Sequence, residues 1–158
     1  MDSKVEMYVK RARTEIDSAK VLYEVSTKVQ IKEILGLDED LTCYSGVISH
    51  SYYAIFYCAK AMIESRNIQT IAPEIHKKTF NEFKKQFIDT GLLDASLLVI
   101  YKELIIRAET LLAIYREEKR KRGQFTYNTI PQANKDPAEQ SIRNARTFFK
   151  HCSSYLSK

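Results

Sequence analysis

Apolar side chains recur at steps of three and four residues along most of the chain, which is the spacing of one face of an α-helix. Val5, Tyr8, Ala12, Ile16 and Ala19, for example, fall on a single stripe. The pattern predicts helices over residues 3–25, 42–65, 73–91, 93–120 and 136–156, with a weaker helical segment over 28–35.

The ends of these helices carry recognisable signals. Ser3 is the expected N-cap of the first helix, because Glu6 follows three residues later. Pro73 suits the first turn of the third helix and Gly91 suits its end. Asp136 is expected to cap the last helix, since a proline follows it directly.

The predicted buried positions form a continuous seam along each helix. They are Phe80, Phe83 and Phe87 in the third helix, Leu97, Tyr101, Leu104, Ala108, Leu111 and Tyr115 in the fourth, and Ala138, Ile142, Ala145, Phe149, Cys152 and Leu156 in the last. Such seams must pack against one another, so the sequence predicts an all-α protein. We expect an antiparallel up-and-down bundle of about five helices, forming one domain over residues 1–158.

Composition supports this fold and bears on location. Only four of the 158 residues are glycine and three are proline, which leaves little material for turns. Cys43, Cys58 and Cys152 lack metal-ligand or redox spacing, so we expect reduced packing residues. The first residues contain no apolar run, and nowhere do about 18 apolar residues follow one another. We therefore expect a cytoplasmic protein without a secretory signal or a membrane segment.

The motifs of common enzymes are missing from the chain. Its 25 basic and 20 acidic residues give a net charge of +5, which leans towards an acidic partner without being extreme. The three histidines are scattered, and there is neither a Glu-x-x-His pair nor a glycine-rich phosphate loop. We expect no metal and no cofactor.

The most informative segment is the aromatic stretch over residues 50–62. Tyr53, Phe56, Tyr57 and Lys60 follow one another at steps of three or four, so they form a stripe on one helical face. Small residues on the neighbouring face let another helix approach closely. Stripes of this kind usually belong to a core, and that interpretation stays open here.

Three segments carry a family resemblance. Residues 49–62 read SHSYYAIFYCAKAM, residues 75–91 begin with Ile-His and continue into a phenylalanine-rich helix, and residues 120–127 read RKRGQFTY. Together they resemble the HEPN domain family, in its small stand-alone prokaryotic branch. The family has a Ser-x-Tyr-Tyr-Ala helix, a Thr-His stretch and an Arg-x-x-x-x-Tyr region in the same order.

The resemblance implies an up-and-down bundle that pairs into a two-fold homodimer, through the aromatic helix and the long helix. Some members of the family are metal-independent ribonucleases that use an Arg-x(4–6)-His motif in a cleft between protomers. Others are non-catalytic binding modules, or partners of a minimal nucleotidyltransferase encoded beside them in toxin–antitoxin pairs.

This chain departs from the ribonuclease motif. Tyr127 stands where the family histidine would follow Arg122, and a phenol with a pKa of about 10 cannot accept a proton at neutral pH as an imidazole can. A literal match from Arg146 to His151 falls inside the predicted last helix, with the two side chains roughly 140° apart. The sequence therefore leans against an enzyme and leaves the catalytic residues unassigned.

The basic turn before the last helix provides the first binding candidates. Arg120 and Arg122 could hold phosphates, because guanidinium groups match phosphate oxygens, and Tyr127 could stack on a base. Alternatively, the cations over residues 119–122 complement the helix dipole, and the loop anchors its aromatic residues on the bundle.

Two histidines and one tyrosine complete the candidate set. His76 lies beside two lysines at the start of the third helix, where an anion would be attracted; the alternative is an exposed histidine of the first turn. His50 and Tyr53 belong to the aromatic helix and are expected to face a dimer cleft. For His50 the alternative is an interface histidine with satisfied hydrogen bonds.

The favoured prediction is a nucleotide- or RNA-binding module, non-catalytic alone and acting with a nucleotidyltransferase-type partner in a toxin–antitoxin-like pair. One alternative is a metal-independent endoribonuclease that uses Arg122 with a non-standard acid–base residue, His50 or His76. The other is a structural dimeric adaptor whose surface charge is incidental.

Overall fold

The computed structural model describes residues 2–120 and 135–158, with side chains described for 2–113 and 135–158. The elements are α1 (Ser3–Thr27), α2 (Val29–Leu35), α3 (Tyr44–Glu64), α4 (Ile75–Phe83), the π-helical turn η1 (Lys84–Ile88), α5 (Ser96–Arg120) and α6 (Lys135–Leu156). The described residues contain no strand. The all-α prediction is thus confirmed, and the helices pack as a bundle.

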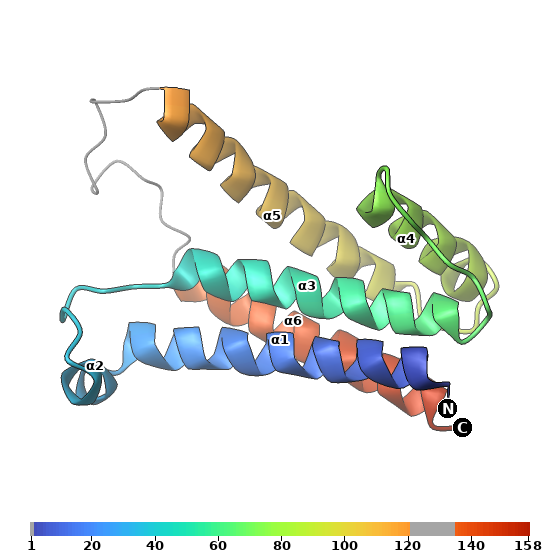
Figure 1. The fold of residues 1–158 in the computed structure, drawn as a ribbon, viewed down its shortest axis with the longest axis horizontal. Helices are drawn as coiled ribbons and strands as arrows, with labels where there is room; N and C mark the ends of the chain where they lie inside the picture. The colour runs from blue at the N-terminus through green and yellow to red at the C-terminus, as the bar shows by residue number, and fades with distance from the viewer. Residues whose placement is uncertain (1, 121–134) are drawn as a thin grey trace.

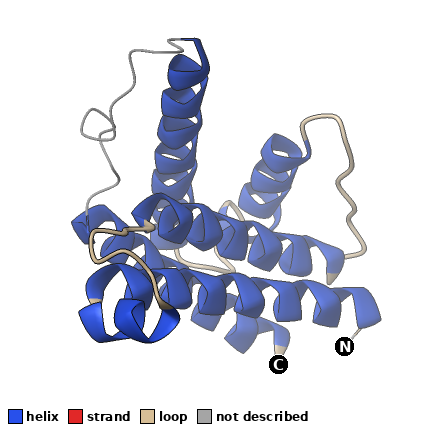
Figure 2. Cartoon of the chain, turned by 60° about the vertical axis from the view of Figure 1, so that its left-hand side comes forward, coloured by secondary structure: helices blue, strands red, loops and turns tan. Residues whose placement is uncertain are grey.

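α3 lies at the centre of the bundle (Figure 1). It runs antiparallel to α1 and α5, and α6 runs alongside it in the same direction. α4 and η1 form a short arm that follows α3 and precedes α5, and α2 lies beyond the end of α1 (Figure 1). Figure 2 shows the helices joined by loops. This is the up-and-down arrangement that the sequence predicts, with the predicted third helix forming the short arm.

The core is built on an aromatic cluster between the short arm, α5 and α6. Phe83, Tyr101 and Phe148 are each 0% exposed, and the ring centroid of Phe83 lies 5.3 Å from that of Phe148. Cys58 and Cys152 are buried beside them, as expected of packing residues. Burial, together with a hydrogen bond to Cys58, raises the pKa of the Cys152 thiol.

The first helix begins one residue earlier than its capping signal indicates. Asp2, not Ser3, is the N-cap: its carboxylate accepts a hydrogen bond from the Lys4 backbone N–H at 2.9 Å. Asp2 has an extended backbone, and a carboxylate also complements the positive end of the helix dipole, so it is the stronger cap.

The predicted helix over 73–91 is divided in the structure. α4 starts at Ile75, because Glu74 has a left-handed backbone with φ of 57°, which a helix cannot accommodate. Pro73 therefore lies before the helix and not in its first turn. From Lys84 the chain becomes π-helical, and the segment finishes near Gly91, whose φ is 72°. Gly91 ends the segment as predicted.

The predicted seam of the last helix is buried at Ala138, Ile142, Ala145 and Cys152, and differs from the prediction at one phenylalanine. Phe148 is fully buried, whereas Phe149, which the pattern placed in the seam, is half-buried beneath the Arg13 guanidinium at 5.2 Å. Ala145, Phe148 and Cys152 follow the i, i+3, i+7 steps of one helical face. Among the described helices, none combines the length and apolar character needed to cross a bilayer.

The corrected seam predicts unequal effects of two neighbouring substitutions. Phe148→Ala should lower the free energy of unfolding by about 3–5 kcal/mol, because it leaves a cavity among fully packed rings. Phe149→Ala should lower the free energy of unfolding clearly less, since the Phe149 ring is only half-buried. Urea denaturation of both variants measures the difference, and equal losses would contradict the assignment of Phe148 to the core.

Candidate functional site

A cleft of about 910 Å³ opens between α3, α4 and α5. Its apolar wall consists of Tyr52, Tyr53, Ile75, Phe80, Ile105, Ile106, Ala108, Leu111 and Leu112, and its polar groups come from Ser49, Glu74, His76, Lys77, Lys102 and Glu109. A mostly apolar cavity with a few convergent polar groups is the usual form of a small-molecule or cofactor site. The charges of the two lysines and two glutamates cancel. Selectivity for one ligand over another must therefore come from the positions of these four groups in the cleft.

The aromatic helix supplies one wall of the cleft. Phe56 is 5% exposed and belongs to the core, whereas Tyr53 is 41% exposed and lies at the mouth. The Tyr53 ring meets the rings of Tyr52 and His76 edge-on, at centroid distances of 5.5 and 6.0 Å. The predicted single stripe therefore divides into a buried part and a part that lines the cleft.

His76 is fixed in this wall by three rings. Its imidazole stacks on Phe56 with centroids 4.3 Å apart, and its Nδ1 lies 2.7 Å from the Tyr52 hydroxyl. Desolvation by burial lowers the pKa of His76 below 6.5, so the neutral ring is favoured at pH 7. The pKa of Tyr52 is raised, chiefly by burial, so its hydroxyl keeps its proton and can donate to Nδ1. In that tautomer Nε2 carries the remaining hydrogen.

The side chains of the two lysines next to His76 lie in different places. Lys77 lines the cleft, whereas the Lys78 ammonium donates to the carbonyl of Ile71 at 3.3 Å. Lys102 joins Lys77 in the cleft from α5. The cationic pair of the cleft is thus Lys77 with Lys102, and the pairing of Lys77 with Lys78 that the sequence indicates does not occur there.

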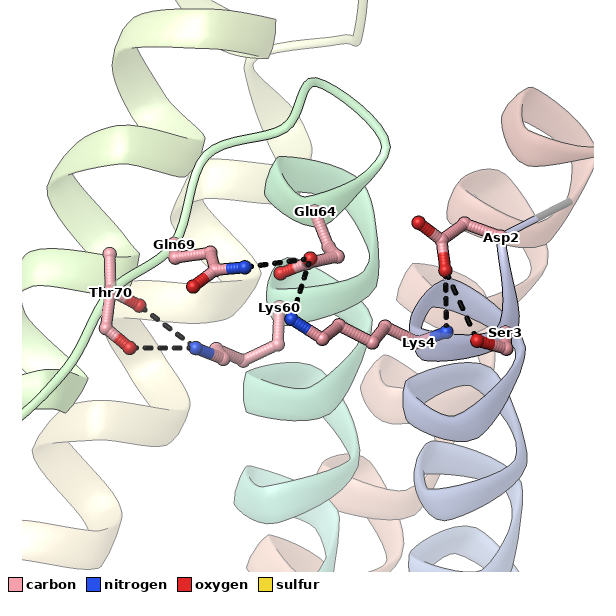
Figure 3. Close-up of polar contacts among 7 residues, drawn as sticks. All are labelled: Asp2, Ser3, Lys4, Lys60, Glu64, Gln69 and Thr70. Carbon is pink, nitrogen blue, oxygen red and sulfur yellow. Dashed lines mark hydrogen bonds and ion pairs between the residues drawn. The ribbon is translucent and has the colours of Figure 1, made fainter.

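A buried lysine fastens the connector that leads to α4. The Lys60 ammonium donates to the Thr70 carbonyl at 2.9 Å and to the Thr70 hydroxyl at 3.1 Å (Figure 3). The Thr70 hydroxyl lies 2.6 Å from that of Thr79, which is on α4. Burial lowers the pKa of Lys60, while the charge of Glu64 acts in the opposite direction. These bonds position α4, and with it His76.

The same end of α3 is tied to the start of the chain. Glu64, only 7% exposed, lies 3.8 Å from the Lys4 ammonium and accepts a hydrogen bond from the Gln69 amide at 3.4 Å (Figure 3). Asp2, which caps α1, holds the backbone of Lys4. The connector, α1 and α3 are therefore joined by one polar network.

His50 does not lie with His76. Its Nδ1 is 2.5 Å from the carboxylate of Glu15 on α1, and its Nε2 has no hydrogen-bond partner among the described residues. Glu15 is 8% exposed and also lies 3.4 Å from the Arg11 guanidinium. The structure therefore contains a second histidine site, a carboxylate–histidine pair on the seam of α1 and α3.

The remaining predicted residues belong to the turn before α6. Arg120 is the last residue of α5, and its side chain lies outside the described part. Arg122 and Tyr127 lie outside the described residues altogether. Arg146 and His151 are both exposed and within α6, as expected for a literal match inside a helix.

Sequence reasoning missed several cleft residues. Tyr52 was visible in the aromatic helix but was not distinguished from its neighbours. Lys102, Ile106 and Glu109 share one face of α5, beside the predicted seam. The sequence signal for this face is the pair of adjacent isoleucines at 105 and 106, because two neighbouring positions of a helix cannot both lie on one narrow seam. In the structure Ile106 is 62% exposed. No described group of three or more His, Cys, Asp or Glu residues could hold a metal ion.

Comparison with known proteins gives one distant relative. The chain is 26% identical over 113 residues to a protein of Methanocaldococcus jannaschii named "Putative toxin MJ0142". The match covers 72% of this chain and 65% of that protein, so the chain spans less than two thirds of its relative. No protein-family model matches the chain, and no solved structure matches it.

The aromatic contacts of His76 predict a pH dependence, although its side chain is exposed. Its pKa in the folded protein is lower than the unfolded value of 6.5, so the unfolded state binds more protons between these two values. Stability should therefore fall as the pH drops from 6.5 through the folded pKa, and His76→Gln should remove that part of the loss. NMR titration of the imidazole C2 proton measures the pKa directly; a midpoint at or above 6.5 would contradict the desolvation argument.

Proposed function

We propose that this protein is a HEPN-like nucleotide- or RNA-binding module, non-catalytic alone, that acts with a nucleotidyltransferase-type partner in a toxin–antitoxin-like pair. The observation that carries the proposal is the arrangement in the cleft, where the rings of Tyr53 and His76 lie beside Lys77 and Lys102. The similarity to a protein named as a candidate toxin supports the biological setting.

Each group in the cleft has a role in this proposal. The exposed ring of Tyr53 offers a stacking face for a base, an interaction of about 1–3 kcal/mol. The ammonium groups of Lys77 and Lys102 pair with phosphate. The carboxylates of Glu74 and Glu109 accept hydrogen bonds from exocyclic amino groups of a base, so they contact the base and not the phosphate.

The proposal includes a homodimer that buries the open side of the cleft. Val99, Ile106 and Leu112 on α5 are each more than half exposed, and such side chains favour a protein contact when they are grouped on one helix. Arg120, Arg122 and Tyr127 would then act on the same ligand from the turn that precedes α6.

Lys102→Gln tests the cleft as the binding site. Affinity for single-stranded RNA should fall, and the slope of log K against log salt should become shallower by about one unit at most, because one phosphate contact is lost. Lys150→Gln is the matched control, since Lys150 is exposed on α6 away from the cleft lining. Fluorescence anisotropy across a salt series gives both quantities, and equal behaviour of the two variants would refute the site. Arg122→Ala in the same assay tests the sequence-predicted turn.

The Glu15–His50 pair favours a second candidate, a metal-independent endoribonuclease. A carboxylate on Nδ1 fixes the tautomer and orientation of an imidazole, which leaves Nε2 able to take the proton of a ribose 2′-hydroxyl. The 2′-oxygen then attacks the adjacent phosphorus, and the departing 5′-oxygen receives the proton. Arg122 would stabilise the negative charge that develops on the non-bridging phosphate oxygens.

An incubation of pure protein with labelled total RNA in EDTA tests this candidate. If the protein is an endoribonuclease of this kind, the wild type should cleave the RNA in EDTA. Both His50→Gln and Arg122→Ala should abolish that cleavage. His151→Gln serves as the control, because that histidine is exposed on α6. Intact RNA with the wild-type protein would retire the enzyme and leave the binding module; absence of any RNA affinity as well would leave a dimeric adaptor.

A further inference from the structure

Three tyrosines form a row that begins at the cleft and crosses the seam between α3 and α1. The ring centroids of Tyr53 and Tyr57 are 6.4 Å apart with planes inclined by 30°. Those of Tyr57 and Tyr8 are 6.3 Å apart with planes inclined by 22°. The three rings are thus evenly spaced, with Tyr57 stacked on Tyr8 and tilted against Tyr53. We call Tyr53, Tyr57 and Tyr8 the tyrosine track.

The track is partly covered, since Tyr53 is exposed whereas Tyr57 and Tyr8 are half-buried. None of the three hydroxyl groups has a hydrogen-bond partner among the described residues, and none is among the fully buried polar atoms there that lack one. Tyr52 and Tyr155, by contrast, bond to His76 and Arg66. Tyrosines that serve only the core usually find a partner for the hydroxyl, so the track has a different character.

Cations accompany the track along its length. The Arg11 guanidinium lies 5.2 Å from the Tyr57 ring centroid, and its side chain is 58% exposed. The Lys60 ammonium lies 5.3 Å from the Tyr8 centroid. Lys4 adds a third cation, against the two carboxylates of Glu15 and Glu64 that pair with Arg11 and Lys4. Lys60 is buried and donates to Thr70, so the cations exposed along the seam are Arg11 and Lys4, each paired with one carboxylate.

We infer that the tyrosine track carries single-stranded RNA out of the cleft and across α3 towards α1. The inference rests on the proposed function and adds that the ligand is a strand and not a mononucleotide. Successive aromatic rings accompanied by cations are how proteins bind single strands without reading their sequence. A duplex is excluded as the ligand, since its bases are stacked on one another and present no free faces. Tyr53 joins the two parts, because it lines the cleft and also begins the track.

The test compares a uridine dinucleotide with an oligouridylate octamer, both fluorescently labelled, on the full chain. Tyr57→Leu should weaken binding of the octamer at least about fivefold, the equivalent of losing one stacked base, and leave the dinucleotide unchanged. Tyr57→Phe keeps the ring and should bind like the wild type. Circular dichroism establishes that each variant is folded.

A second readout does not depend on affinity. The chain contains no tryptophan, so Tyr57→Trp places a single indole in the track. Its emission should be quenched by the octamer and not by the dinucleotide. If Tyr57→Trp is unfolded, the Leu and Phe variants still decide the matter.

The outcomes separate the track from the proposed function. Wild-type protein that binds neither probe would overturn both. Binding of both probes with no selective effect of Tyr57→Leu, or with equal loss for both, would overturn the track alone. A change of molecular mass in light scattering with unaltered octamer binding would also overturn it, and would assign the three rings to a contact between copies of the chain.

Discussion

The structure depends on the close packing of α3 within the bundle. Ala54, Ala59 and Ala61 are each 0% exposed, so the helix axis is approached closely by its neighbours. With most of its surface covered, α3 has only a narrow strip left for larger side chains. Tyr52 and Tyr53 face the short arm on this strip, and His50 and Tyr57 face α1. The His76 site and the His50 site therefore both lie along the part of α3 that its neighbours leave uncovered.

The two histidines have different environments for the same reason. His76 is packed against aromatic rings, and desolvation lowers its pKa, so it acts as a neutral hydrogen-bonding group. His50 lies against the carboxylate of Glu15, an acceptor that orients the ring and favours proton transfer. One site is therefore suited to recognition and the other to acid–base chemistry. The tyrosine track begins at Tyr53, beside the first of these sites.

Much of the fold could be predicted from the sequence, because helical seams are local in character. The errors were also local: Asp2 caps better than Ser3, and the seam of α6 follows Phe148 instead of Phe149. The cleft could not be predicted, since it depends on how α5 diverges from α3 (Figure 1). Nor could the pairing of Glu15 with His50, which are 35 residues apart and meet only through the register of two helices.

The central claim is that the cleft between α3, α4 and α5 binds nucleotides. Amide NMR spectra recorded during titration with an oligouridylate octamer test it most directly. The account predicts that the largest shifts fall on Tyr53, His76 and Lys102 and on their neighbours in the cleft. Shifts confined to α2 or to the exposed face of α6, or a spectrum that does not change, would contradict it.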